Sequence, residues 1–187
     1  MKEESDKVTF GFWLYIMSDC VLFAALFAAY AVLNGQTYGG FTLQDIASLP
    51  YVLVETLLLL TSSFTVGLAL LAAHYNKKQL TLLALAATLV LGLSFLGMEL
   101  SEFSHLIAQG HSWRQSAFLT SFFTLVGTHG LHVLLGSVWM LVLTAHIVIR
   151  GLTVGSIRKL LCLSLFWHFL DIVWVCIFTF VYLWSAL

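Results

Sequence analysis

The chain has 187 residues, of which 60% are hydrophobic and only 9% are charged, and its mean hydropathy is +0.98. Soluble domains average about 25% charged residues, so this composition excludes an ordinary soluble protein and predicts an integral membrane protein. The formal net charge of −1 gives no sign of a nucleic-acid partner. The three cysteines lie in or beside apolar segments, at spacings that match no metal motif.

Five segments are long and apolar enough to cross a bilayer, which takes about 20 residues in a helix. They are residues 10–34, 50–75, 79–106, 117–149 and 160–185. Short polar stretches with Gly, Asn, Gln and Lys separate them, as is typical of loops. The sequence therefore predicts an all-α polytopic membrane protein: a bundle of five transmembrane helices that forms a single membrane domain over residues 1–187.

The basic residues divide unequally between the two sides of this predicted bundle. Seven of the eight fall on the side of the N-terminus: Lys2, Lys7, Lys77, Lys78, Arg150, Arg158 and Lys159. Only Arg114 falls on the other side. Because cytoplasmic loops carry the excess of Lys and Arg, we expect a cytoplasmic N-terminus and a periplasmic C-terminus. Trp13, Trp113 and Trp184 come close to the predicted helix ends, where interfacial aromatic residues gather.

Ionisable residues interrupt the apolar segments at two depths, counted at 1.5 Å per helical residue. Those near the middle of the bilayer are Asp19, His129, His132, His168 and Asp171. Those nearer the outer face are Glu55, Glu99, Glu102 and His105. His129 and His132, like His168 and Asp171, are three residues apart and so share a helix face.

Two interpretations of these residues are open at this point. One is a metal or haem site, or a proton path, since ionisable residues inside membranes often mark such functions. The other is an internal hydrogen-bonded network, because a neutral histidine can donate from one ring nitrogen and accept at the other. A di-metal site in a bundle uses Glu-x-x-His on two helices and further glutamates at the same depth. The sequence does not supply that set, so we expect the network.

Small residues indicate where helices approach closely. Ala24, Ala25, Ala28 and Ala29 follow a small-xxx-small pattern in the first predicted span, which is typical of helix contacts in membranes. Gly127, Gly130 and Gly136 lie on either side of the histidine pair in the fourth span. We expect these glycines to let another backbone approach that pair.

Several stretches resemble one known family, subunit III of the haem–copper terminal oxidases. The resemblance is carried by FFTLVGTHGLHVLLGS and FWHFLDIVWVCIFTFVYL in the last two spans and by GFWLYIMSDCVLFAALFAAY in the first. LVETLLLLTSS and ELSEF match the intervening helices in the same order. Together they cover about residues 10 to 185. The chain is most similar to the short five-helix form found in cytochrome bo-type ubiquinol oxidases.

The resemblance implies a subunit without catalytic, cofactor-binding or metal sites of its own. Haem b, haem o and copper are expected in subunit I, the main partner, beside subunits II and IV of the complex. Bound phospholipid is expected in a cleft, and the location implied is the bacterial inner membrane. Asp19 stands where the family typically has a carbodiimide-reactive Glu. The residues that match family positions as they stand are Glu55, Glu102, His129, His132, His168, Asp171 and Trp174.

The resemblance thus implies a non-catalytic subunit of a proton-pumping quinol oxidase, which supports assembly, stability and lipid retention in aerobic respiration. One alternative is subunit III of a cytochrome c oxidase, which differs in the electron donor of the complex. The other is a stand-alone proton-coupled transporter that uses Asp19, His168 and Asp171 as its path. Transporters usually show internal repeats and broken helices, and the sequence shows neither.

Overall fold

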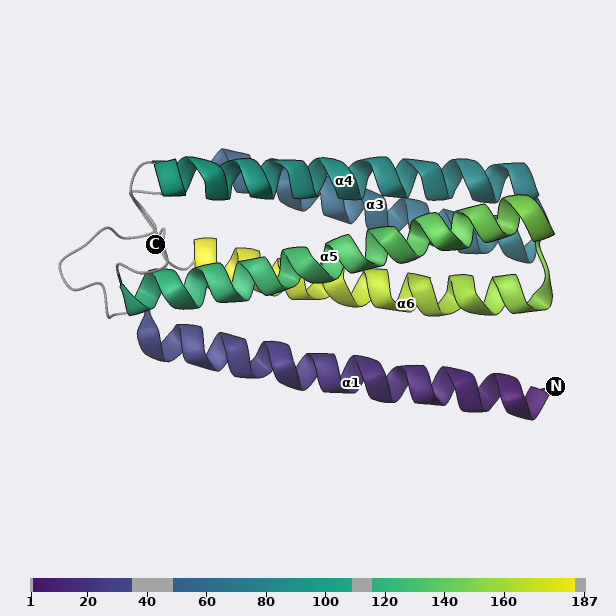
Figure 1. The fold of residues 1–187 in the computed structure, drawn as a ribbon, viewed down its shortest axis with the longest axis horizontal. Coiled ribbons are helices and arrows are strands. Elements are labelled where there is room, and N and C mark those ends of the chain that lie inside the picture. The colour runs from purple at the N-terminus through teal and green to yellow at the C-terminus, as the bar shows by residue number, and fades with distance from the viewer. Residues whose placement is uncertain (1, 35–48, 109–115, 184–187) are drawn as a thin grey trace.

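The computed structural model describes residues 2–34, 49–108 and 116–183, and within these ranges the chain is helical and contains no strand (Figure 1). The helices are α1 (Lys2–Leu33), α3 (Leu49–His74), α4 (Lys78–Ala108), α5 (Ala117–Arg150) and α6 (Val154–Ile177), the last continued by a π-helical segment, η1 (Phe178–Leu183). Five stretches are long and apolar enough to cross a membrane. The prediction of an all-α polytopic bundle is confirmed.

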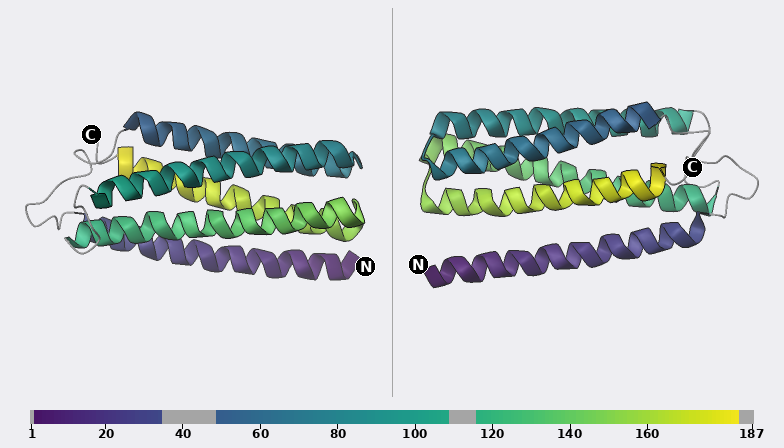
Figure 2. Two further views of the ribbon diagram at one scale, coloured as in Figure 1. Left: turned by 45° about the horizontal axis from the view of Figure 1, so that its top comes forward. Right: turned by 180° about the vertical axis from the view of Figure 1, so that it is seen from behind.

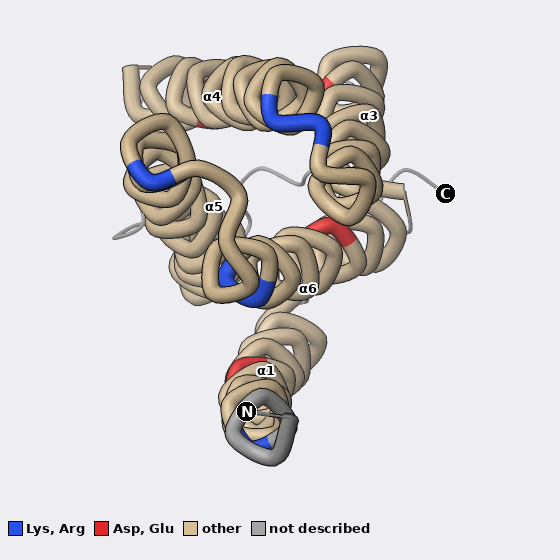
Figure 3. Tube along the Cα trace, turned by 90° about the vertical axis from the view of Figure 1, so that its right-hand side faces the viewer, with Lys and Arg blue, Asp and Glu red and all other residues tan. Residues whose placement is uncertain are grey.

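Four of the helices form a ring, and the fifth lies outside it. Viewed from one end, α3, α4, α5 and α6 surround a common interior, and each contacts its two neighbours (Figure 3). Helix α1 lies along the outer side of the ring, against α5 and α6 (Figures 1 and 2). This arrangement gives the buried polar residues two kinds of place: the interior of the ring and the seam between α1 and the ring.

Short, well-capped turns join the ring helices at one end. Between α3 and α4 the chain turns at Asn76, whose φ of 56° lies in the left-handed region that asparagine tolerates. Between α5 and α6 it turns at Gly151, with φ of 76°. Thr153 then caps α6, because its hydroxyl accepts a hydrogen bond from Ser156 N at 3.2 Å.

The predicted spans agree with the helices except at two starts. Helix α1 begins at Lys2 and α6 at Val154, earlier than the predicted residues 10 and 160. In both cases the first turns contain several polar or charged residues, which the prediction from apolar length left out although they are helical. For α6 the cause is the Thr153 cap, which satisfies an N–H of the first turn.

Basic residues gather at the end of the bundle that holds the N-terminus (Figure 3). They are Lys7 in α1, Lys77 and Lys78 at the α3–α4 turn, Arg150 at the end of α5, and Arg158 and Lys159 in the first turns of α6. Arg114, Trp113 and Trp184, used in the sequence analysis, lie outside the described residues. The cytoplasmic position of the N-terminus therefore stays a prediction.

The alanines of α1 do not pack against the described residues of this chain, so their expected helix contact stays a prediction. Ala24, Ala25, Ala28 and Ala29 are all exposed. Helix α1 instead buries Ile16, Asp19, Phe23 and Tyr30 against the ring. Large aromatic residues, rather than small ones, make this seam, and Phe23 lies close to His132 and Phe169.

Candidate functional site: the buried polar residues

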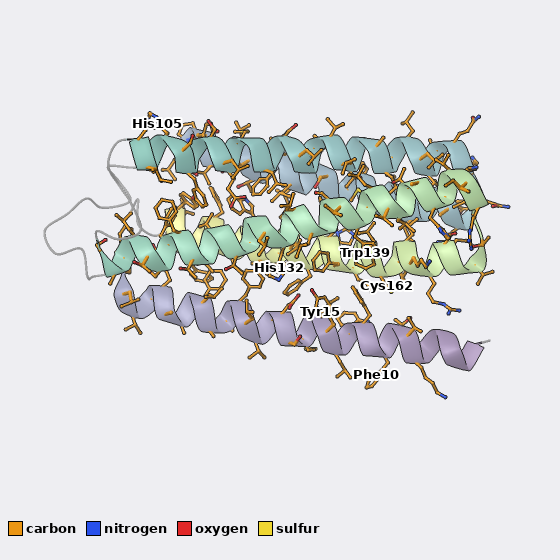
Figure 4. All side chains as sticks on the ribbon, in the orientation of Figure 1. Phe10, Tyr15, His105, His132, Trp139 and Cys162 are labelled. Carbon is orange, nitrogen blue, oxygen red and sulfur yellow. The ribbon has the colours of Figure 1, made fainter. Side chains whose placement is uncertain are left out.

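Asp19 and His132 lie opposite each other in the seam between α1 and α5. His132 Nε2 is 3.8 Å from Asp19 Oδ2, which is longer than a hydrogen bond. The other ring nitrogen, Nδ1, lies 2.7 Å from Thr128 O and donates to it, since a carbonyl only accepts. Tyr15, one turn before Asp19, interacts with the same carboxyl group. Figure 4 shows Tyr15 and His132 between α1 and the ring.

His168 and Asp171 belong to a different contact, between α6 and α3. His168 Nδ1 lies 2.6 Å from the hydroxyl oxygen of Ser63. The same hydroxyl lies within hydrogen-bonding reach of Asp171. Asp171 is 9% exposed, and its Oδ1 atom has no hydrogen-bond partner within the described ranges. Ser63 therefore joins the two ionisable residues of α6 to the neighbouring helix.

His129 lies in the interior of the ring, where it is fully buried. Its Nε2 atom donates to Leu170 O at 3.2 Å, and its ring lies 5.1 Å from that of Trp174. The Trp174 indole N–H donates in turn to Thr56 Oγ1 at 3.1 Å. These contacts connect α5, α6 and α3 through two aromatic rings.

Three glutamates lie in the ring interior near the end that carries η1. Glu55 is 0% exposed and Glu99 is 3% exposed, and they interact electrostatically with each other and with Glu102. Tyr182, which η1 turns inward, lies 3.4 Å from Glu102 Oε2 through its hydroxyl. His105, predicted to belong to this group, is exposed near the end of α4 (Figure 4).

Gly130 makes room for one of these carboxyl groups. A Cβ atom at Gly130 would lie 2.7 Å from both carboxyl oxygens of Glu99. At Gly136 the nearest groups would be the rings of Phe166 and Trp167, at 3.0 and 3.2 Å. The glycines were expected to admit a backbone, and the structure shows that these two admit side chains instead.

The polar residues predicted for the mid-bilayer thus divide among three places. Asp19 and His132 meet in the α1 seam, His168 and Asp171 meet at α3, and His129 lies inside the ring. Sequence reasoning missed the hydroxyl groups that take part in these and neighbouring contacts. Ser63 pairs with His168, Thr56 with Trp174, Ser62 with Trp167 and Tyr182 with Glu102. The only available signal was that these residues occur in otherwise apolar segments.

Metal-ligand side chains are not clustered in the described part of the chain. Over residues 2–34, 49–108 and 116–183, no group of three or more His, Cys, Asp or Glu residues could hold a metal ion. His129 is directed at a backbone carbonyl, His168 at a serine and His132 at an aspartate, each in a different helix contact. What the arrangement does chemically is to join helices through hydrogen bonds within an apolar protein.

Comparison with known proteins gives a consistent result over nearly the whole chain. The family described as cytochrome c oxidase subunit III matches residues 3–186. The chain is 58% identical to cytochrome bo(3) ubiquinol oxidase subunit 3 of Pseudomonas aeruginosa, over 99% of this chain and 88% of the relative. It is 46% identical to the protein of that name from Buchnera aphidicola subsp. Schizaphis graminum, over 93% and 92%. It is 44% identical to cytochrome c oxidase subunit 3 of Bacillus sp. strain PS3, over 92% and 84%.

Proposed function

Because the chain belongs to the cytochrome c oxidase subunit III family, we propose that it is the third subunit of a bacterial haem–copper quinol oxidase. The observation that carries the choice of quinol is the 58% identity to a relative named as a ubiquinol oxidase subunit, against 44% to one named as a cytochrome c oxidase subunit. In this assignment, quinol oxidation and oxygen reduction take place in the partner subunits. Haem b, haem o and copper are then bound by subunit I.

The role of this subunit is to support assembly and stability. Most of the buried polar residues contact a neighbouring helix through its side chains or its backbone: Asp19, His132, His168, Asp171, His129 and Trp174. Glu55 and Glu102 face the ring interior. Truncating one member of a buried polar pair leaves the other unsatisfied, at a cost of about 1 to 3 kcal/mol. Such contacts therefore fix which helices neighbour one another and in which register.

The partners in this proposal are subunit I as the main contact, subunits II and IV, and phospholipid of the inner membrane. The proposal of bound phospholipid is supported by a groove of about 570 Å³ between α1, α5 and α6, which we call the basic groove. Phe12, Tyr15 and Trp139 line its apolar part, and Arg158 and Lys159 line its basic end (Figure 4 labels Tyr15 and Trp139). Arg158 Nε is buried and has no hydrogen-bond partner in the described part of the chain. A phosphate group at this end would supply one.

A stand-alone transporter has less support from the geometry. Its path would need Asp19, His168 and Asp171 to be connected. Asp19 faces His132 in the α1 seam, whereas His168 and Asp171 face Ser63 of α3. The two contacts are on different helix neighbours, and no hydrogen-bond chain joins them within residues 2–34, 49–108 and 116–183.

The test is to purify the tagged chain from its native membrane in mild detergent. A haem spectrum should be recorded and the co-purifying subunits identified. We expect haem of the b and o types and a large subunit I. A haem-free chain, alone or with unrelated proteins, would reject the proposal, and proton flux by the chain alone in liposomes would favour the transporter.

A further inference from the structure

Two glutamates in the ring interior carry carboxyl groups that no other group in the described chain satisfies. Glu55 belongs to α3 and Glu99 to α4, which are neighbours in the ring (Figure 3). All four of their carboxyl oxygens are buried and have no hydrogen-bond partner within residues 2–34, 49–108 and 116–183. Buried polar atoms without a partner are rare in folded proteins, so four of them at one place require an explanation.

The electrostatic neighbours of these two residues are carboxyl groups as well. Glu55 and Glu99 interact with each other, and both interact with Glu102, which lies one turn after Glu99 on α4. The lysines and arginines of the described ranges lie toward the opposite end of the bundle, near the N-terminus (Figure 3). These basic residues therefore provide no counter-charge for the three glutamates.

The other titratable side chains around the glutamates make contacts elsewhere. They come from four of the surrounding elements: Tyr51 of α3, His105 of α4, His129 of α5 and Tyr182 of η1. Tyr51 donates to Met98 O at 2.9 Å, and His129 donates to Leu170 O. Tyr182 lies against Glu102, and His105 is exposed near the end of α4. From α6, His168 and Asp171 face Ser63 instead.

Burial without a partner decides the charge of Glu55 and Glu99. An ionised carboxylate in an apolar interior is so unfavourable that the group takes up a proton instead. Repulsion between neighbouring carboxylates acts in the same direction. A protonated carboxyl group has no net charge and offers one O–H donor. The surroundings of Glu55 and Glu99 therefore favour carboxylic acids over carboxylates.

Glu102 connects these buried groups with the outside of the bundle. It is partly exposed, whereas Glu99 is 3% exposed and Glu55 is 0% exposed. Glu99 and Glu102 are three residues apart on α4 and so share one helix face. The π-helical segment η1 places the Tyr182 hydroxyl 3.4 Å from Glu102 Oε2. Such segments occur frequently at functional sites.

We propose that Glu55 and Glu99 form a proton-binding site in the ring interior, which exchanges protons with the aqueous phase at the η1 end through Glu102. A carboxylate that takes up a proton becomes a carboxylic acid, and it returns to a carboxylate when the proton leaves, so no other reactant is consumed. A bridging water molecule, which both donates and accepts, carries the proton between carboxyl groups that do not touch. This inference goes beyond the proposed function and assigns a site to this chain itself.

The first test is infrared difference spectroscopy of the complex at neutral pH, purified through a tag on this chain. The C=O band of a carboxylic acid is separate from the bands of a carboxylate, and signals of the other subunits cancel in the difference. We expect Glu55→Gln and Glu99→Gln each to lose a carboxylic-acid band. Glu4→Gln is the control, because Glu4 precedes the apolar span that begins at Lys7 and should lose a carboxylate band.

Loss of a carboxylate band in Glu55→Gln or Glu99→Gln would overturn the proton-binding site. Where a glutamine variant does not assemble, the aspartate variant at the same position takes its place. Aspartate keeps a carboxyl group, so the carboxylic-acid band should shift but remain. An unshifted carboxylic-acid band would overturn the assignment of that band to the substituted residue.

The second test addresses the path through Glu102. Transfer of the complex into D2O shifts the band of a carboxylic acid when its proton exchanges. We expect this shift in the unaltered complex and in Glu4→Gln, and we expect the band to stay unshifted over the same time in Glu102→Gln. Glutamine keeps an acceptor for the Tyr182 hydroxyl but cannot take up and release a proton in this way. The same shift in Glu102→Gln, or no shift in the unaltered complex, would overturn the path.

Discussion

The indole ring of Trp167 lies directly against the backbone of Gly92, so that α6 reaches across the ring interior to α4. A Cβ atom on Gly92 would come within 2.8 Å of Trp167 Cζ2 and 2.9 Å of Cη2. The indole N–H of the same residue donates to Ser62 Oγ of α3 at 2.9 Å. Together with its contact at Gly136 of α5, Trp167 touches all three of the other ring helices.

Gly92→Ala should therefore destabilise the bundle. Trp167 is held by a hydrogen bond and by close packing, so it cannot move without cost. Overpacking of this kind typically costs about 1 to 3 kcal/mol. We expect a lower midpoint of thermal unfolding for the purified complex. Gly97→Ala on the same helix is the control, because a Cβ there would meet nothing within 4 Å. Equal effects of the two substitutions would contradict the prediction.

Gly130→Ala should also destabilise, and removal of Glu99 should relieve much of the effect. The added methyl group would clash with the carboxyl oxygens of Glu99 at 2.7 Å. In the double variant with Glu99→Ala that clash is absent, so the two changes should not be additive, with a coupling of about 0.5 to 3 kcal/mol. The measurement is the thermal midpoint of all four proteins in the cycle. Additive losses would show that the close approach has no energetic consequence.

Asp171→Leu should reduce the amount of assembled complex more than its activity. The change leaves Ser63 and His168 without their common neighbour in the α3–α6 contact, at a cost of about 1 to 3 kcal/mol. Haem per milligram of membrane protein reports assembly, and oxygen consumption per haem reports turnover. Asp171→Asn, which keeps polar atoms at the same place, should be milder. Normal haem content with reduced turnover per haem would argue for a direct role in catalysis.

Asp19→Ala should alter lipid retention or slow inactivation and leave haem content unchanged. Asp19 interacts with Tyr15, and Tyr15 lines the basic groove, so the substitution loosens one wall of that groove. Bound phosphorus per haem and activity over many turnovers are the two measurements. If both match the unaltered complex, Asp19 has no influence on the lipid.

Arg158→Gln should lower the content of anionic phospholipid in the purified complex selectively. The reason is that Arg158 offers a buried Nε atom at the basic end of the groove. Arg150→Gln is a suitable control, since Arg150 lies at the same end of the bundle but does not line the groove. Lipid analysis by mass spectrometry reads out both variants. Equal losses would indicate a general effect of charge rather than a site.

Within the described residues, the five membrane-crossing helices and most of their ends were predictable because the apolar segments can be counted directly in the sequence. The residues that interrupt the apolar segments were also visible as such. Their partners were not. His129 and His132 share a face by spacing, yet one lies inside the ring and the other looks outward to α1. The rotation of α5 about its own axis decides which of the two histidines faces the ring interior. That rotation depends on how the five helices pack together, and the periodicity of the sequence gives no information about it.

The contacts of the glycines were likewise only partly predictable from the sequence. Their positions predicted close approach correctly, but not what approaches. Gly130 faces a carboxyl group and Gly136 faces aromatic rings. The bulky partners come from α4 and α6, far away in the sequence. To predict which large side chain packs against a given glycine, one must therefore first know which helices are neighbours.

The position of α1 outside the ring has a consequence for how the protein is made. Its neighbours are α5 and α6, which follow it in the chain after α3 and α4, so α1 meets its partners only after those later helices have been inserted. Until then Asp19 faces the bilayer, where a carboxylate costs roughly 2.5 to 3.5 kcal/mol at mid-depth. Biogenesis thus includes an interval in which α1 carries this cost without its partner helices, and only the apolar length of Lys7–Leu33 offsets it.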